Sequence, residues 1–461
     1  MTQAYVQAHR YRFFTIAAIG TFMGTLDGSI LNVALPTIAS DLSCRIDQVA
    51  WVVMAYAATL VALMMVFGAW AQRRGYPFAY KFGYAAFLLG STVCILSRDI
   101  NMLIAGRVIQ GVGAAMFQAV GIGLVTEVFP PSERGKGIGT MVMMVSAGLM
   151  AGPPIGGFLL QYFPWQSIFI INLPIGLVAL VLSQMFFRKF PLPTTTARMH
   201  LTGAAALATA LLTAMLGLSF FDEYPFWSLQ VGGCWTLMVI AATLFIVGEN
   251  RPHRALIGLD IFHNAEFSLR LVAMLLMFVA LAGSLVLLPF FLQNVKGLSP
   301  RTLGLYLTIL PVTMFFTARQ AGWLSDRFGY RILTTGGLLL VSVGFALFQW
   351  FEVATQPVYI ALSLVLIGFG VGIFGTPNAS AVMGAIPQEQ RATASGIVST
   401  TRNLGMAIGI AVSTGLFAFL QNRMHLSDGA EAFLTPFHQV AILSVIAAFA
   451  GAVISFTRRN R

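Results

Sequence analysis

Charged residues are scarce in this sequence. Asp, Glu, Lys and Arg together make up 9% of its 461 residues, whereas hydrophobic residues make up 57%. Soluble globular domains carry about a quarter of their residues as charges, so this composition excludes a water-soluble core. It predicts a protein embedded in a lipid bilayer.

Cysteine and clustered polar ligands are also few. The three cysteines, Cys44, Cys94 and Cys234, lie far apart, so neither a disulfide framework nor a metal site is expected. The sequence has no phosphate-binding glycine loop or nucleophile–base pair, and we therefore expect neither an enzyme nor a cofactor. The net charge of +11 comes from bases scattered through short segments, which argues against nucleic acid as a partner.

Long apolar runs dominate what remains. A helix crosses a bilayer with about 20 apolar residues, and we count 14 such windows. The first begins at Phe13, is long and contains Asp27, so we expect it to be retained as a helix and not cleaved as a leader. The windows lie near residues 13–33, 48–70, 78–97, 102–126, 137–160, 166–187, 202–221, 229–248, 268–292, 302–318, 332–350, 358–380, 393–420 and 437–457.

Basic residues are distributed unequally between the two sides of these spans. With both termini in the cytoplasm, 20 of the 27 Lys and Arg residues fall on the cytoplasmic side, and Arg107 and Arg402 lie inside spans. The positive-inside rule therefore predicts cytoplasmic termini. The five bases on the outer side are Arg45, Arg98, Lys296, Arg301 and Arg423.

A loop motif occurs twice, as GAWAQRRGYPFAYK at 68–81 and as GWLSDRFGYR at 322–331. The repeat predicts two six-span units, 11–190 and 265–458, with two additional spans in 201–248 between them. The second copy is more complete, because it has an acid where the first has Gln72. The motif positions are Gly68, Arg73 and Gly75 in the first copy and Gly322, Asp326, Arg327 and Gly329 in the second.

A glycine pattern occupies the fifth span, in GIGTMVMMVSAGLMAGPPIGG at 137–157. Gly148, Gly152 and Gly156 recur every fourth residue, so they predict a helix face without side chains against which a neighbouring backbone can pack. The prolines that follow Gly152 predict a bend at that face. The complete pattern consists of Gly139, Gly148, Gly152, Pro153, Gly156 and Gly157.

Together these motifs resemble those of the major facilitator superfamily. The glycine pattern resembles the fifth-span signature of its drug:proton antiporters, and LDGSILNVALP at 26–36 and RVIQGVGAA at 107–115 resemble its fourteen-span branch. Ser29 and Ile30 depart from the usual Thr and Val. The resemblance implies an all-α integral membrane protein with the major facilitator fold, two six-helix halves plus two extra central spans. It also implies proton-driven efflux of amphipathic small molecules.

Asp27 is the candidate proton site. It lies about 14 residues into the first span, where a carboxylate costs about 3 kcal/mol. Because desolvation favours its protonated form, this group can carry a proton whose affinity depends on the side that it faces. The alternative is a structural carboxylate, paired with a base or capping a neighbouring helix.

Arg107 begins a polar stripe on the fourth span with Gln110 and Gln118, which lie within about 60° and 20° of it on a helical wheel. The resemblance implies that Arg107 lies near the proton site, where its charge favours ionised Asp27. The alternative is an arginine that snorkels outward. Arg402, in the thirteenth span, has either a similar coupling role or a structural one.

The cargo is the least determined part. The 38 phenylalanines and 21 methionines can line an adaptable cavity but are also ordinary residues of membrane helices. The expected partners are a small-molecule substrate, protons and the bilayer, which we take to be a bacterial inner membrane. A periplasmic adaptor and an outer-membrane channel stay open as further partners. A dedicated exporter of one metabolite or peptide-like product, a lipid flippase and a non-transporting sensor stay open as alternative functions. Candidate cavity residues are Phe117, Met141, Met143, Met144 and Asn378, with Gln110, Gln118 and Arg402.

Overall fold

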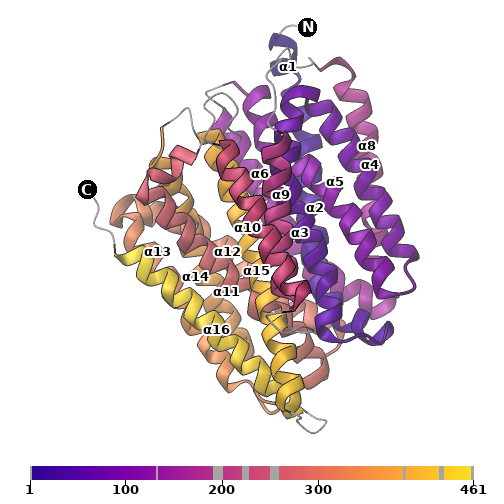
Figure 1. Cartoon of the computed structure of the whole chain (residues 1–461), viewed down its shortest axis with the longest axis vertical. Coiled ribbons are helices and arrows are strands. Elements are labelled where there is room, and N and C mark those ends of the chain that lie inside the picture. The colour runs from indigo at the N-terminus through magenta and orange to yellow at the C-terminus, as the bar shows by residue number, and fades with distance from the viewer. Residues whose placement is uncertain are drawn as a thin grey trace. The chain divides into compact units, whose positions relative to one another are not determined.

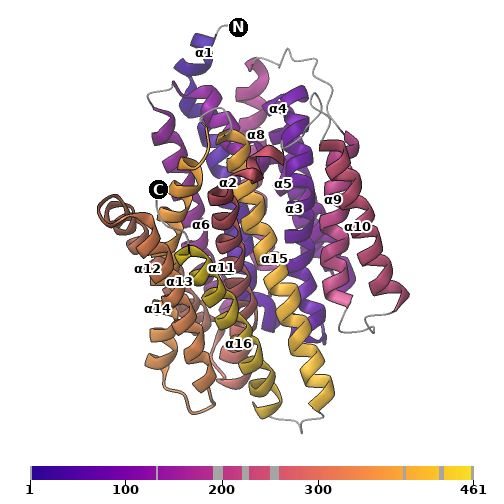
Figure 2. The ribbon, with the colours of Figure 1, turned by 60° about the vertical axis from the view of Figure 1, so that its left-hand side comes forward.

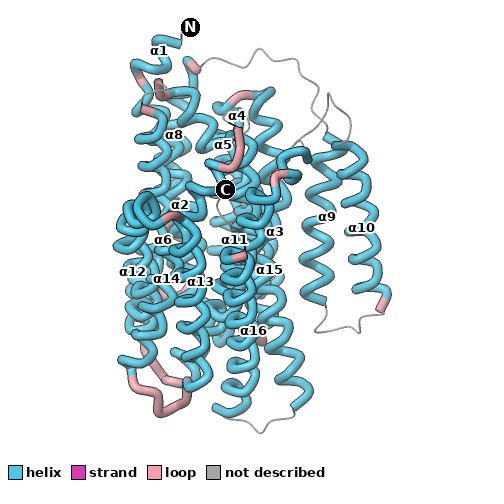
Figure 3. Tube along the Cα trace, turned by 90° about the vertical axis from the view of Figure 1, so that its left-hand side faces the viewer, coloured by secondary structure: helices cyan, strands magenta, loops and turns pink. Residues whose placement is uncertain are grey.

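The computed structural model is helical apart from turns and loops between the helices, over its described residues, which are 3–130, 133–190, 201–220, 228–249, 259–387, 391–424 and 430–457. Within these ranges no residue belongs to a strand (Figure 3). The expectation of an all-α protein is therefore confirmed.

Figure 1 shows the helices in chain order. The N-terminal part comprises α1 Gln3–Ala8, α2 Arg10–Asp41, α3 Ile46–Arg74, α4 Tyr76–Leu96, α5 Ile100–Val128, α6 Arg134–Tyr162, α7 Ser167–Ile170, α8 Asn172–Phe186 and the 3₁₀ turn η1 Phe187–Lys189. Two helices follow, α9 Leu201–Ser219 and α10 Leu229–Glu249. The C-terminal part comprises η3 Leu259–His263, α11 Ala265–Phe290, the π-helical η4 Phe291–Val295, α12 Pro300–Phe328, α13 Tyr330–Ala346, η5 Leu347–Trp350, α14 Pro357–Gly384, α15 Arg391–Met424 and α16 Ala430–Phe456.

Thirteen helices among the described residues are long and apolar enough to cross a membrane. A further apolar helix, Thr202–Gly217 within α9, is shorter than the 18 residues that define the others. It corresponds to the sequence window at 202–221. The count is thus consistent with the 14 expected spans.

Contacts divide the chain into two compact units. The first consists of Met1–Cys44, Trp51–Thr213 and Thr236–Ile257, and the second of Arg45–Ala50, Ala214–Trp235 and Gly258–Arg461. In the first unit α2 packs on α6, and α4 packs on α5. In the second, α11 packs on α15, and α13 packs on α14 beside α12 (Figure 2). The same pairing of helices therefore occurs in each unit.

Glycines of α6 contact the backbone of α2. A Cβ placed on Gly148 would lie 2.9 Å from the carbonyl oxygen of Phe22, and one on Gly152 would lie 2.8 Å from the amide nitrogen of Ile30. These distances leave no room for a side chain. Gly156 meets Ile30 in the same way, and the helix continues through Pro153 to Tyr162. Gly157 is also buried, whereas the surroundings of Gly139 lie outside the described part.

A similar contact joins α15 to α11 in the second unit. A Cβ on Gly405 would lie 2.8 Å from the carbonyl oxygen of Leu275, and one on Gly409 would lie 3.0 Å from the Cα of Val279. The sequence analysis did not identify this second face, because its third member, Ser413, interrupts the glycine spacing.

The repeated loop contains two glycines with the same conformation. Gly75, directly before α4, has a φ of 83°, and Gly329, directly before α13, has a φ of 77°. L side chains rarely adopt this region, so the turn requires glycine at both positions. Arg327 is exposed, with its guanidinium 5.6 Å from the ring of Phe328.

Two further glycines of the motif lie beside neighbouring helices, at distances where a Cβ would make ordinary contact. A Cβ on Gly68 would lie 3.8 Å from Ala119 of α5, and one on Gly322 would lie 3.5 Å from Thr376 of α14. The side chains of Gln72, Arg73 and Asp326 lie outside the described part of the structure.

Candidate functional site

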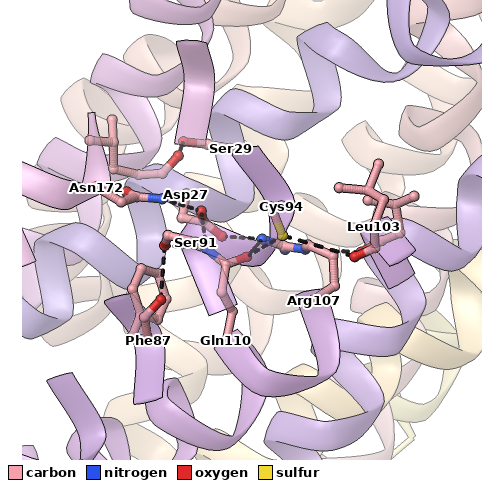
Figure 4. Close-up of polar contacts among 11 residues, drawn as sticks. Asp27, Ser29, Phe87, Ser91, Cys94, Leu103, Arg107, Gln110 and Asn172 are labelled. Atoms are coloured by element: carbon pink, nitrogen blue, oxygen red, sulfur yellow. Dashed lines mark hydrogen bonds and ion pairs between the residues drawn. The ribbon is translucent and has the colours of Figure 1, made fainter. Parts of the chain in front are cut away.

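A buried ion pair joins α2 to α5 in the first unit. Arg107 Nη1 donates to Asp27 Oδ2 at 2.5 Å, and the two side chains are 0% and 1% exposed (Figure 4). The helices approach closely here because α2 carries glycines on this side. A Cβ on Gly24 would lie 2.8 Å from Gln118 Nε2, and one on Gly20 would lie 3.1 Å from the ring of Phe117.

Arg107 is fixed from several directions. Its Nε donates to the carbonyl oxygen of Val52 on α3 at 3.0 Å, and its Nη1 also donates to Gln110 Oε1 at 2.7 Å. The guanidinium lies 4.3 Å from the ring centroid of Tyr56, within cation–π range. One nitrogen, Nη2, is buried without a hydrogen-bond partner. Arg107 therefore points into the protein and does not snorkel outward.

Two amide side chains complete the surroundings of the carboxylate. Asn172 Nδ2 donates to Asp27 Oδ1 at 2.7 Å, and Gln110 Nε2 lies 3.4 Å from the same oxygen. Gln110 Nε2 also donates to Ser91 Oγ on α4 at 2.7 Å. Four helices, α2, α4, α5 and α8, thus contribute to one polar network (Figure 4). Donors surround the ionised form of Asp27.

Asn172 was not identified from the sequence. It is the first residue of α8, where the span Ser167–Phe186 is interrupted at Ile171. Its side chain is fully buried, and its Oδ1 has no hydrogen-bond partner in the described part of the chain. An amide two residues before Pro174 in an otherwise apolar span was the available signal, since both features mark an irregular helix start.

The structure brings Asp27, Arg107 and Gln110 together, and it places Gln118 at the same α2–α5 contact. Of the proposed cavity residues, Phe117 is buried and stacked on Tyr84, with ring centroids 5.2 Å apart. Met141 is buried, Met144 is half-buried and Met143 is exposed. Asn378, which is buried, and Arg402, which is half-buried, belong to the second unit. Among the described residues no three His, Cys, Asp or Glu side chains come together as metal ligands would.

The family model of the Major Facilitator Superfamily matches residues 17–410. The chain belongs to this superfamily. The riboflavin transporter RibZ of Clostridioides difficile is 35% identical over 408 residues, which cover 87% of each chain. The multidrug resistance protein Stp of Mycobacterium tuberculosis is 30% identical over 414 residues, which cover 89% of this chain and 76% of that protein.

Among solved structures of the superfamily fold, the peptide transporter POT in complex with sulfate has a TM-score of 0.71. The match covers 98% of each chain at 15% sequence identity, so this likeness concerns the fold alone. Superfamily membership and the thirteen apolar helices identify the chain as a multi-pass membrane transporter. The relatives and the fold are those of transporters, in agreement with the expectation that the protein is not an enzyme.

Proposed function

We propose that this transporter exports amphipathic small molecules in exchange for protons, by alternating access. The observation that carries the proposal is the Asp27–Arg107 pair, which is fully buried in a membrane span. Ionisable groups at such depth are costly, and they mark ion or proton pathways in membrane proteins. The pair is also the point where α2 and α5 are joined electrostatically.

Proton binding and helix arrangement are linked through this pair. When Asp27 takes up a proton its charge disappears, and Arg107 keeps Gln110, Val52 and the rings of Tyr56 and Phe169. Loss of one partner from a buried ion pair costs about 3–5 kcal/mol. A two-state equilibrium moves from 1:99 to 99:1 with about 5.5 kcal/mol. Protonation of one carboxyl group therefore destabilises the present arrangement by an amount comparable with what such a switch requires, and it biases the switch to the extent that the second arrangement gives Arg107 another partner.

The α6 glycine face provides a route for this change to spread. Ser29, two residues after Asp27, donates a hydrogen bond to the carbonyl oxygen of Gly148 at 3.0 Å. Because the backbones of α2 and α6 are in direct contact, a displacement of the helix that carries Asp27 moves α6 with it. This coupling supports a protein that alternates between two arrangements.

The breadth of the cargo has two candidate answers. The name of one relative indicates multidrug resistance, which supports broad efflux. The name of another indicates riboflavin, which favours a second candidate, an exporter dedicated to one metabolite. Both candidates use the same proton step at Asp27.

The test is transport by the purified protein in vesicles with an imposed pH gradient, against a panel of amphipathic dyes, antibiotics and riboflavin. We expect the wild type to concentrate several compounds against their gradients and Asp27→Asn to lose this uphill movement, because its amide cannot release a proton. Asp27→Glu keeps the acid, displaced by about one methylene, and should be partly active. Full uphill transport by Asp27→Asn would refute the proton site. Riboflavin as the sole cargo would select the dedicated exporter, and movement of phospholipid alone would select a flippase.

A further inference from the structure

The second unit contains an arginine without a partner inside a membrane span. Arg402 lies in the span Gly396–Gln421 of α15 and is half-buried. It forms no hydrogen bond, ion pair or aromatic contact with the described part of the chain. Arg107 of the first unit, by contrast, has Asp27, Gln110, Val52 and Tyr56 as partners.

The direction of Arg402 can be read from the packing of α15. At about 100° per residue, Arg402 lies within about 20° of Gly409 and 60° of Gly405, the two glycines that contact α11. Its side chain therefore leaves α15 on the side of α11. It begins six residues into the span, about 9 Å along the helix from the first residue of the span.

The acid of α11 is already engaged. Glu266 Oε1 accepts hydrogen bonds from Arg270 Nη2 at 3.0 Å and from Tyr330 Oη at 2.7 Å. The guanidinium of Arg270 also lies 3.8 Å from the ring centroid of Tyr330, which holds the three side chains together. Arg402 therefore receives no charge compensation from this residue.

A neighbouring donor is unsatisfied as well. Asn403 Nδ2 is buried and has no hydrogen-bond partner among the described residues. It follows Arg402 directly on α15, about 100° around the helix, so a cation and an amide donor lie side by side. Thr400 Oγ1, also buried and without a partner there, lies about 160° from Arg402 and therefore on another side of the helix. Buried polar groups normally find partners, and Arg402 and Asn403 can both donate to the same kind of acceptor.

We propose that Arg402, with Asn403 beside it, binds an anionic group of the cargo, such as a carboxylate, sulfonate or phosphate. An anionic oxygen compensates the guanidinium and accepts the hydrogen bonds that the chain leaves open. The inference rests on the proposed export function and assigns the chemical class of its cargo: amphipathic molecules that carry a negative charge. The described spans hold no second deep acid that would attract a cation instead.

The test compares ligands that differ only in charge. Purified full-length protein in detergent is titrated with pairs of amphipathic aromatic carboxylates and their primary amides, and with sulfonates and their sulfonamides, by equilibrium dialysis. We expect the wild type to bind the anion of at least one pair about ten- to a hundredfold more tightly than its neutral partner. Arg402→Gln should remove that preference and leave amide binding unchanged. Arg402→Lys keeps the charge and should retain part of the preference.

Arg301→Gln is the matched control, because it removes one positive charge from an exposed position in the first turn of α12. It should leave both members of each pair unaffected. The inference is overturned if no anion is preferred by the wild type, if Arg402→Lys behaves as Arg402→Gln does, or if Arg301→Gln has the same effect. Gel filtration and thermal melting verify that each variant is folded.

Asp27→Asn separates this inference from the export function on which it rests. If the anion site and the proton-driven export are both correct, this variant still binds the anion selectively but no longer moves it against its gradient. Uphill movement that persists in Asp27→Asn refutes the proton site and leaves the anion site intact. Uphill movement of neutral compounds by a wild type that prefers no anion refutes the anion site alone.

Discussion

Replacement of Asn172 by alanine should shift the pH dependence of transport toward alkaline pH. Asn172 Nδ2 donates to Asp27 Oδ1 at 2.7 Å, and both side chains are buried. A hydrogen bond to a charged group contributes about 1.5–3 kcal/mol, and one pH unit corresponds to about 1.4 kcal/mol. Because this bond favours the ionised carboxylate, its loss favours the protonated form. The pH profile of transport should then move about one to two units toward alkaline pH.

The lower end of this range is the better expectation. Asn172 Oδ1 has no hydrogen-bond partner, so a rotation of the amide lets it accept from the protonated carboxyl group. The wild-type amide then stabilises both the ionised and the protonated carboxyl group in part. Its removal therefore changes the free-energy difference between these two forms by less. We therefore expect a displacement of about one pH unit.

The measurement is the pH dependence of gradient-driven transport, together with the infrared absorption of the protonated carboxyl group. The absorption that disappears in Asp27→Asn identifies the relevant band. Ser183→Ala is the control, because Ser183 is also buried in α8 but donates only to the carbonyl oxygen of Leu180. An unshifted profile in Asn172→Ala, or an equal shift in the control, would show that the amide does not act on Asp27.

Two further predictions concern packing and topology. Gly152→Leu should insert into the membrane but lose transport, because a Cβ at this position already lies 2.8 Å from the backbone of α2. The control is Gly375→Leu, which should retain activity because a Cβ at Gly375 meets nothing within 4 Å. Equal transport by both variants would contradict the packing argument. Reporter fusions after Arg461 should report a cytoplasmic position, and fusions at Asp47 and Lys296 should report an external one, because basic residues are concentrated on the cytoplasmic side. The opposite pattern would mean that a span has been miscounted. A cytoplasmic fusion site at Thr195 is also expected, in a segment outside the described residues.

Much of the fold could be predicted because its signals lie along single helices. Apolar length marked the spans, including the window at 202–221, where α9 has only a short apolar section. The repeated loop marked Gly75 and Gly329, which need a left-handed φ whatever surrounds them. These features depend on local conformation and on the bilayer, so a single sequence contains them.

The partners of Asp27 depended instead on how separate helices rotate and meet. The depth of Asp27 and the stripe of Arg107 and Gln110 could be read from the sequence, and the alternative of a paired carboxylate was open. That Asn172 of α8 and Ser91 of α4 complete the network follows from packing across four helices. The sequence likewise reveals the depth of Arg402 in its span, but not that the described residues leave it without a partner.

The contact between α6 and α2 distributes evolutionary constraint unequally between the two helices. The atoms of Phe22 and Leu26 that approach Gly148 belong to the backbone, which every amino acid shares. Substitutions at these two positions leave the contact surface itself unchanged, while any side chain on Gly148 or Gly152 obstructs it. Natural variation along this interface should therefore accumulate at α2 positions such as Phe22 and Leu26, and not at Thr25 or Ser29, whose side chains lie nearest to Gly148 and Gly152. The α6 side should stay glycine even where the cargo has changed.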